Sequence, residues 1–267
     1  MLSIREQINY VNSLIAQAEK SLRSKTEGTL VVSKRIKSVQ YYHQYYENGL
    51  RKRIYLKKTQ DKTIRKLAQT EYDNAFLKDA KDLLEKLEIL KPLNADRDEA
   101  LLYDELSSSY DKLSPERKSL VIPYVLPRVE YTERWLNKEY ANKGIGRDIT
   151  SFITENGENV RSKSEKIIAD KLHSMGIPYR YEEELCLQGM YVHPDFTLLD
   201  PHKRKVYYYE HFGMMQDPEY CRNAIIRIAK YERAGYRLGR EFFCTFESEE
   251  NPLDIKMLET KFSFLKS

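Results

Sequence analysis

The first part of the chain has apolar residues at alternating spacings of three and four, a pattern that predicts one amphipathic helix. The stripe consists of Ile4, Ile8, Val11, Ile15, Ala18 and Leu22. Three strand-like segments follow, at about 29–34, 39–46 and 50–57. Asn48-Gly49 separates the last two, and both residues tolerate a positive φ. We therefore expect a helix followed by a small three-stranded antiparallel sheet.

A longer helix is predicted from about Asp61 to Lys91, and Pro92 follows its end. Its expected buried face consists of Ile64, Leu67, Ala68, Tyr72, Phe76, Ala80, Leu83, Leu84 and Leu87. Residues 97–141 have the pattern of shorter helices interrupted by prolines. The two glycines of segment 142–146 indicate a linker after them.

Beyond this linker the pattern changes to alternating helices and strands. We expect a helix at 161–175, strands at 178–187, 191–200 and 205–212, a helix at 218–234, a β-rich run at 241–247 and a last helix. This order predicts an α/β domain with a mixed sheet and a hairpin at its centre. The expected fold class is α+β or α/β, with a helical region and its small sheet at 1–95, a helical connector at 96–146, and the α/β domain at 147–267.

The composition limits the possible locations of the chain. Of 267 residues, 41% are apolar and 32% are charged, and no apolar run reaches membrane-spanning length. The N-terminus lacks the basic-then-apolar layout of a signal peptide. Three scattered cysteines are too few for a disulfide framework or a zinc cluster. We therefore expect a cytoplasmic protein that does not enter a membrane.

The central hairpin of the predicted α/β domain carries two acidic residues. If Asp200 pairs with Lys205 across the turn, the antiparallel register places Asp195 directly opposite Glu210. Their Cβ atoms would then be roughly 5 Å apart. Two carboxylates this close repel each other, unless one is protonated or a cation lies between them. The spacing therefore suggests a cation site.

Glu165 is a third candidate for the same site. It precedes Ile168, Ala169 and Leu172 by three, four and seven positions, so it shares the apolar stripe of its helix. A carboxylate on a buried stripe is costly unless it is paired or bound to a metal. The alternative is a Glu in a first helical turn that complements the helix dipole. Three converging carboxylates would suit Mg²⁺ or Mn²⁺.

Three short motifs resemble the core of the PD-(D/E)xK nucleases, a superfamily with a restriction-endonuclease-like fold. They are Arg161-Ser-Lys-Ser-Glu165, His193-Pro194-Asp195-Phe196 and Tyr209-Glu210-His211-Phe212-Gly213-Met214. The Glu-His-Phe-Gly-Met string resembles a variant found in nuclease domains attached to some superfamily 1 helicases and in small uncharacterised bacterial proteins. The resemblance covers about residues 150–267.

The resemblance implies specific roles for these residues. Asp195 and Glu210 would hold Mg²⁺ or Mn²⁺, helped by the backbone carbonyl of His211, while Glu165 would bind directly or through water. The metal would lower the pKa of a bound water and neutralise charge on the scissile phosphate. The implied activity is metal-dependent hydrolysis of DNA phosphodiesters.

One position departs from the family pattern, because Phe212 stands where the third motif normally has a lysine. Arg227 or Lys230 on the following helix, or the side chain of His211, could replace that lysine. Arg227 would be a poor general base because it stays protonated, but it could stabilise the transition state. It lies at the edge of the apolar stripe of its helix, so we expect it to have the larger effect.

The segment from Lys34 to Lys66 contains eleven Lys or Arg residues, against only Glu47 and Asp61. A sheet followed by a helix loosely resembles the N-terminal DNA-binding modules of tyrosine integrases. Lys and Arg can contact phosphates, and Tyr can stack on exposed bases. The candidate nucleic-acid-binding residues are Lys34, Arg35, Lys37, Tyr42, Arg51, Lys52, Arg53, Lys57 and Lys58. The alternative is an ordinary solvated face.

The predicted function is a Mg²⁺-dependent deoxyribonuclease with a basic nucleic-acid-binding module. Two alternatives remain open. The chain could be a nucleic-acid-binding protein that keeps the nuclease fold and has lost turnover through Phe212. It could also be an adaptor whose long helices bind a protein partner or a second copy of the chain.

Overall fold

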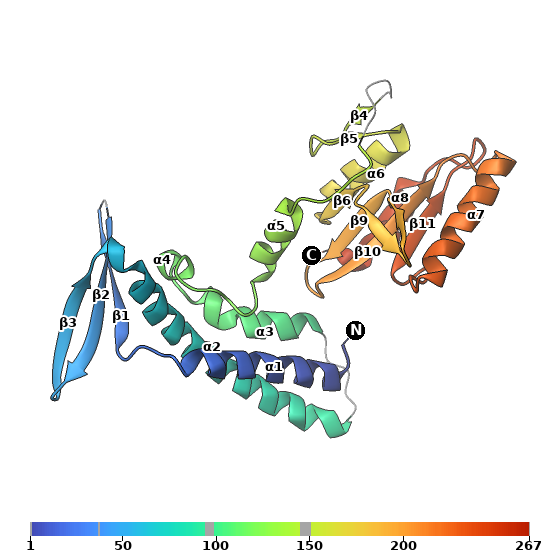
Figure 1. Ribbon diagram of the computed structural model, residues 1–267. Helices are drawn as coiled ribbons and strands as arrows, with labels where there is room; N and C mark the ends of the chain where they lie inside the picture. Colours follow the sequence, from blue (N-terminus) through green and yellow to red (C-terminus); the bar gives the residue numbers. More distant parts are fainter. Residues whose placement is uncertain (1, 37, 94–98, 145–150, 267) are drawn as a thin grey trace. The chain divides into compact units, whose positions relative to one another are not determined.

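The chain has an α+β fold in a computed structural model, which describes residues 2–36, 38–93, 99–144 and 151–266 (Figure 1). It forms two compact units, Met1–Glu130 and Tyr131–Ser267, which we call unit 1 and unit 2. Helices α3 and α4 of the predicted connector belong to unit 1, and helix α5 crosses the boundary. Residues 145–150 at the predicted linker lie outside the described residues.

Unit 1 consists of helices and one small sheet. Its helices are α1 (Ile4–Leu22), α2 (Asp61–Leu90), α3 (Glu99–Asp111), α4 (Pro115–Lys118) and the start of α5 (Arg128–Asn137), with 3₁₀ turns at Lys58–Gln60 and Lys91–Leu93. Ser3 and Glu6 form a capping box that begins α1, because each side chain bonds the backbone N–H of the other residue.

The apolar stripes predicted for the first two long helices are confirmed. Ile8, Val11, Ile15 and Ala18 of α1 are buried in one core with residues of α2 from Ile64 to Leu87, and α3 adds Leu102 and Leu106. Burial of such stripes is the main stabilisation of helices in water, since isolated helices are marginal. The three helices thus share the hydrophobic core of unit 1.

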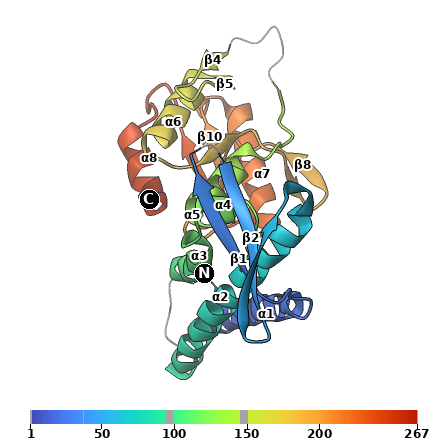
Figure 2. The ribbon, with the colours of Figure 1, turned by 90° about the vertical axis from the view of Figure 1, so that its left-hand side faces the viewer.

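The sheet of unit 1 has the strand order β1-β2-β3, with all strands antiparallel. The strands are β1 (Thr29–Arg35), β2 (Ser38–Glu47) and β3 (Leu50–Leu56). Asn48 and Gly49 both have positive φ, 52° and 76°, as the hairpin prediction requires. The sheet lies at the end of the α1–α2 pair where α1 ends and α2 begins (Figures 1 and 2).

Unit 2 is built on a mixed four-stranded sheet with the order β11-β10-β9-β6. Its strands are β6 (Tyr179–Tyr181), β9 (Phe196–Asp200), β10 (Lys205–Phe212) and β11 (Phe242–Phe246). Two hairpins stand apart from it: β4 (Phe152–Ile153) with β5 (Asn159–Val160), and β7 (Leu185–Leu187) with β8 (Met190–Val192). The helices are α6 (Lys163–Ser174), α7 (Pro218–Arg233) and α8 (Ile255–Phe262), followed by a 3₁₀ turn at Ser263–Leu265.

Helices cover both faces of this sheet. Side chains of α6 and α8 form one core with Tyr207 and Tyr209 of β10, whereas α7 packs with Phe212 of the same strand on the other face. Residues of even and odd number in β10 therefore point to different helices. Glu210 shares the face of Phe212, so it points toward α7.

Two strand predictions were wrong, because the segments at 178–187 and 191–200 are each interrupted. Glu182 has a φ of 49° and ends β6, so that β7 leaves the main sheet. Segment 193–195 separates β8 from β9, and Pro194 has no N–H to donate to a strand ladder.

The predicted register of the central hairpin is confirmed. Lys205 pairs with Asp200 and Tyr209 pairs with Phe196. The carboxylate of Asp200 accepts the N–H groups of His202 and Lys203, each at 3.0 Å, and so closes the turn.

Among the described residues, no helix combines the length and the apolar character that spanning a membrane requires. All three cysteines are free thiols, with Cys186 exposed, Cys221 half-buried and Cys244 buried.

Candidate active site

Asp195 and Glu210 lie at one end of the β9–β10 hairpin. Asp195 directly precedes β9, and Glu210 follows Tyr209, the last residue of β10 that pairs with β9. The backbone N–H of His211 donates to Asp195 Oδ2 at 2.6 Å. The backbone of Asp195 is fixed as well, since its carbonyl accepts the N–H of Glu182 at 3.1 Å. Asp195 is thus held against β10 beside Glu210.

Glu165 reaches the same end of the sheet from the first turn of α6. Its Oε2 accepts the N–H of Arg161 at 2.7 Å and the hydroxyl of Tyr181 at 2.8 Å. With Ser162 it forms a capping box, in which Ser162 Oγ accepts the N–H of Glu165 at 3.1 Å. The carboxylate therefore caps its own helix and also faces the site.

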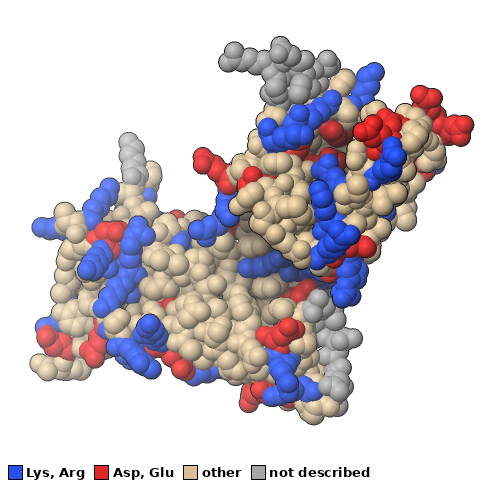
Figure 3. All heavy atoms as spheres, turned by 45° about the vertical axis from the view of Figure 1, so that its right-hand side comes forward, with Lys and Arg blue, Asp and Glu red and all other residues tan. Residues whose placement is uncertain are grey.

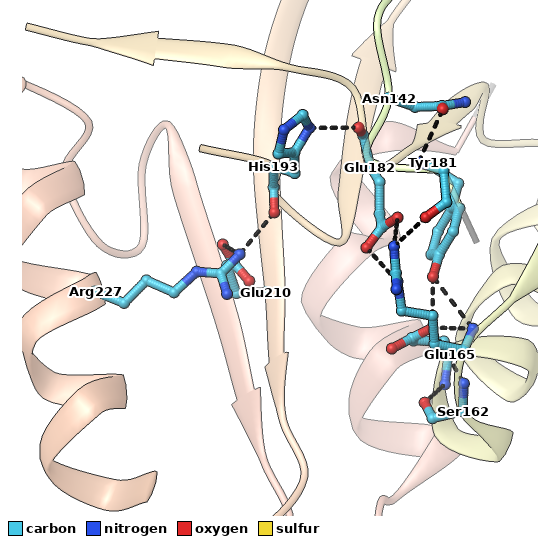
Figure 4. A network of polar contacts seen from close by, with 10 residues as sticks. Asn142, Ser162, Glu165, Tyr181, Glu182, His193, Glu210 and Arg227 are labelled. Atoms are coloured by element: carbon cyan, nitrogen blue, oxygen red, sulfur yellow. Dashed lines mark hydrogen bonds and ion pairs between the residues drawn. The ribbon is translucent and has the colours of Figure 1, made fainter. Parts of the chain in front are cut away.

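Glu210 is almost fully buried, with 1% of its surface exposed, and α7 neutralises it. Arg227 Nη2 lies 2.7 Å from Glu210 Oε1, and the hydroxyl of Tyr231 donates to the same oxygen at 2.6 Å. Arg227 Nη2 also donates to the carbonyl of His193 at 2.6 Å (Figure 4). The arginine thus joins α7 to Glu210 and to the segment before β9.

These residues surround a cleft of about 500 Å³. Glu165, Asp195, Arg227 and Lys230 line it together with Lys143, Arg161, Glu182, Val192, His193, Asn223 and Ile226. Four of the predicted site residues are therefore brought together. Glu210 is connected to the cleft through Arg227, and Lys230 has no ion-pair partner within the described part of the chain.

Burial strongly perturbs the acids at this end of the sheet. It raises the pKa of Asp195 to about 7. The hydrogen bond from the N–H of His211 and the charge of Arg227 act in the opposite direction and lower this pKa. Burial is also the main reason why the pKa of Glu210 lies well above its ordinary value, and the charge of Asp195 adds to it. Burial alone would lower the pKa of Arg227, but attraction to Glu210 and Asp195 raises it.

The donor chemistry of the site fits a hard divalent cation, although the carboxylates are not arranged around one. In the described residues, no group of three His, Cys, Asp or Glu side chains lies in position for a metal ion. Each candidate carboxylate nevertheless directs one oxygen to its protein partners: Glu165 Oε2, Asp195 Oδ2 and Glu210 Oε1. A ligand in the cleft would meet the second oxygens of Glu165 and Asp195, the two of these carboxylates that line it.

The side chain of His211 does not join this cluster. Its Nδ1 lies 2.9 Å from Thr245 Oγ1 and its Nε2 lies 2.9 Å from Glu247 Oε2, on the face of the sheet opposite to Glu210. Of the roles predicted for His211, a side-chain replacement for the missing lysine is therefore disfavoured. Phe212 is buried and stacks on Phe246 with ring centroids 5.6 Å apart.

Two residues of the site, Glu182 and Tyr231, were not predicted from the sequence. Arg161 holds Glu182 with a two-pronged ion pair, with N···O distances of 2.9 and 3.0 Å. Glu182 was not predicted, because it belongs to a run of three glutamates with no distinguishing spacing. Tyr231 was not predicted either, but it follows Arg227 by four positions and so shares its helix face.

The candidate nucleic-acid-binding residues occupy different positions on the sheet of unit 1. Arg35, Arg51 and Arg53 are exposed, and Tyr42 is half-buried. Two lysines are paired instead, Lys34 with Glu116 at 2.8 Å and Lys52 with Glu47. Lys57 and Lys58 are exposed at the start of the 3₁₀ turn. Lys37 lies outside the described residues.

Comparison with known proteins gives one short similarity. The chain is similar to "Uncharacterized protein MJ1519" of Methanocaldococcus jannaschii, with 39% identity over 69 residues, which is 26% of this chain and 6% of that protein. The chain thus spans a small fraction of this relative's length. No known family profile matches the chain, and no solved structure matches it.

Proposed function

We propose that unit 2 is a metal-dependent nuclease that hydrolyses phosphodiester bonds in DNA. The proposal is supported by the convergence of Glu165, Asp195 and Arg227 on one cleft, with Glu210 bound to the arginine. Buried carboxylates beside each other favour a cation between them, since they otherwise repel or take up protons. Their order along the chain matches the motifs that resemble the PD-(D/E)xK nucleases.

Each residue has a role in this proposal. Asp195 and Glu210 would hold Mg²⁺ or Mn²⁺, and Glu165 would bind it directly or through water. A bound cation would supply a lower pKa for a water molecule and would neutralise charge on the phosphate. Lys143, Arg161 and Lys230 line the cleft, so they attract the DNA backbone to an otherwise acidic site.

Arg227 would perform one role of the lysine that the third PD-(D/E)xK motif normally has, the stabilisation of charge. Its guanidinium comes from α7, the helix that follows the third motif, and it already contacts Glu210. From this position the guanidinium would stabilise a phosphate oxygen that gains charge during the reaction. Because arginine keeps its proton, its role is charge stabilisation and not deprotonation of water.

The deciding experiment compares two acids of the same strand region. Asp195→Asn should remove Mg²⁺-dependent cleavage of DNA and weaken binding of Mn²⁺ alone, measured by calorimetry. Asp200→Asn is the matched control, because Asn keeps an oxygen that can close the turn. Equal cleavage by wild type and Asp195→Asn would overturn the proposed site.

We also infer that the basic sheet of unit 1 binds the nucleic acid. Figure 3 shows Lys and Arg atoms spread over the end of unit 1 that carries the sheet. Phosphate contacts from such residues supply affinity that does not depend on sequence.

One observation favours a second candidate, a nucleic-acid-binding protein without turnover. Arg227 and Tyr231 already neutralise Glu210, and Phe212 offers no group that could move a proton. DNA binding without cleavage in either Mg²⁺ or Mn²⁺ would support this candidate over the nuclease.

A further inference from the structure

The sheet of unit 1 has two chemically different faces. Opposite residues of an antiparallel pair point to the same face, and successive residues alternate between faces. Val32, Tyr41 and Leu56 are opposite one another and share a face with Leu30. All four belong to the core formed with the helices, so this is the inner face. The other face, which we call the outer face, has no buried residue.

The outer face combines arginines and tyrosines. The register places Arg35, Arg51, Arg53, Tyr42, Tyr46 and Tyr55 on it. None of the residues that the ladder assigns to this face is Asp or Glu. In contrast, Glu47 lies on the inner face, where it pairs with Lys52. The outer face is therefore electrostatically complementary to a polyanion.

Arginines and aromatic rings alternate along this face. Tyr42 lies opposite Tyr55, with ring centroids 5.6 Å apart. The next row contains Arg53, whose guanidinium lies 5.9 Å from the centroid of the Tyr42 ring, and the row after it pairs Tyr46 with Arg51. Tyr46 and Tyr55 are 71% and 49% exposed. Large rings this exposed on one face indicate a binding surface.

We propose that the outer face binds single-stranded DNA by stacking bases on Tyr42, Tyr46 and Tyr55 and by pairing phosphates with Arg51 and Arg53. Bases of a single strand can offer their flat faces to tyrosine rings, whereas bases of a duplex are stacked on one another. The alternation of rings and cations suits a strand in which bases and phosphates alternate. The choice of DNA over RNA rests on the proposed function.

The test measures binding of the full chain to fluorescent oligothymidylate, to its duplex with oligoadenylate, and to oligouridylate, all in EDTA. The single DNA strand should bind most tightly. Tyr46→Ala and Tyr55→Ala should each weaken this binding by at least about fivefold, the scale of one lost base–tyrosine stack. Ile54→Ala is the matched control, because Ile54 is also half exposed but lies on the inner face.

A second comparison removes one positive charge from each face of the sheet. Arg53→Ser should weaken binding, while Lys52→Ser, one residue away on the inner face, should change it little. Tighter binding to the duplex would overturn the proposal. So would a loss from Ile54→Ala equal to that from the two tyrosine variants, or a loss from Lys52→Ser equal to that from Arg53→Ser. Tighter binding to oligouridylate would overturn the choice of DNA.

The same measurements keep this inference separate from the proposed nuclease. Binding is measured in EDTA and so does not depend on cleavage. If Asp195→Asn loses cleavage and still binds the single strand, the proposal for the outer face stands. Conversely, cleavage that persists while Tyr46→Ala and Tyr55→Ala leave binding unchanged would overturn the outer face alone.

Discussion

The cleft of unit 2 and the outer face of unit 1 both depend on arginine, but they use it in opposite ways. Arg227 is fixed, with Glu210 and the carbonyl of His193 as partners. Arg53 is exposed, and its contacts are the amide oxygen of Gln44 at 3.1 Å and the ring of Tyr42. A guanidinium that is fixed beside buried carboxylates suits the stabilisation of charge on one reacting group. Exposed guanidinium groups on an acid-free face suit affinity for a mobile polyanion.

The largest expected effect tests the chemical side of this contrast. Glu210→Gln should reduce Mg²⁺-dependent cleavage to background, as should Asp195→Asn, because the cation loses a charged ligand. Neither variant should alter binding of DNA to the sheet in EDTA. A gel assay of cleavage together with an anisotropy titration checks both statements, and cleavage by both variants at the wild-type rate would contradict the first.

The next effect concerns the fixed arginine itself. Arg227→Ala should lower the single-turnover cleavage rate at saturating Mg²⁺ by at least ~10²-fold, the usual scale for losing one fixed charge-stabilising donor. Lys230→Ala should cost much less, since Lys230 lines the same cleft without contacting Glu210. Arg227→Lys offers an ammonium from the same helix position. A wild-type rate for Arg227→Ala would show that this arginine is no substitute for the missing lysine.

A smaller effect tests the exposed arginines. Replacing Arg51, Lys52 and Arg53 together should weaken binding to many sequences alike and flatten the dependence of log affinity on log salt. Each lost phosphate contact should reduce that slope by roughly 0.7 for a single strand. Because Lys52 pairs with Glu47 on the inner face, the double variant of the two arginines should account for nearly all of the change. An unchanged slope would rule out phosphate contacts here.

The smallest effect is on stability in metal-free buffer. Burial raises the pKa of Asp195 to about 7 in the folded protein, so the folded state holds this proton more tightly than the unfolded chain. The free energy of unfolding should therefore fall as pH rises from the carboxyl's ordinary pKa through about 7, by at most about 1.4 kcal/mol per pH unit.

Asp195→Asn removes this loss of stability. Urea titrations should find the variant more stable than wild type at about pH 8, with a smaller difference at about pH 5, where the wild-type carboxyl is protonated. A difference that is the same at both pH values would show that the carboxylate does not titrate as described.

Local patterns were sufficient to predict most of the fold and the central pair of acids. The turn between Asp200 and Lys205 set the register, and the register put Asp195 beside Glu210. Arg227 was predicted to reach the acids from the edge of the apolar stripe of α7, and it contacts Glu210. Both predictions rest on periodicity within one or two elements, which sequence records directly.

The rest of the site depends on features that periodicity does not record. Glu182 enters the cleft because its backbone has a positive φ, which is unusual for a glutamate and has no sequence signal here. His193 lines the cleft from segment 193–195, which interrupts the predicted strand 191–200, so strand alternation does not give its position. The capping role of Glu165 was not predicted, although Ser162-Lys-Ser-Glu165 is a known sequence pattern of helix starts.

The burial of Phe212 has a consequence for how this site can change over generations. Phe212 is 3% exposed and belongs to the apolar cluster between α7 and the sheet. A single Phe212→Lys change would place an ammonium among the apolar and aromatic side chains between α7 and the sheet. A lysine at position 212 would therefore require changes in the side chains of α7 that pack against it. The residue at position 212 is thus tied to the packing of α7 against the sheet, and a change at one requires a change at the other.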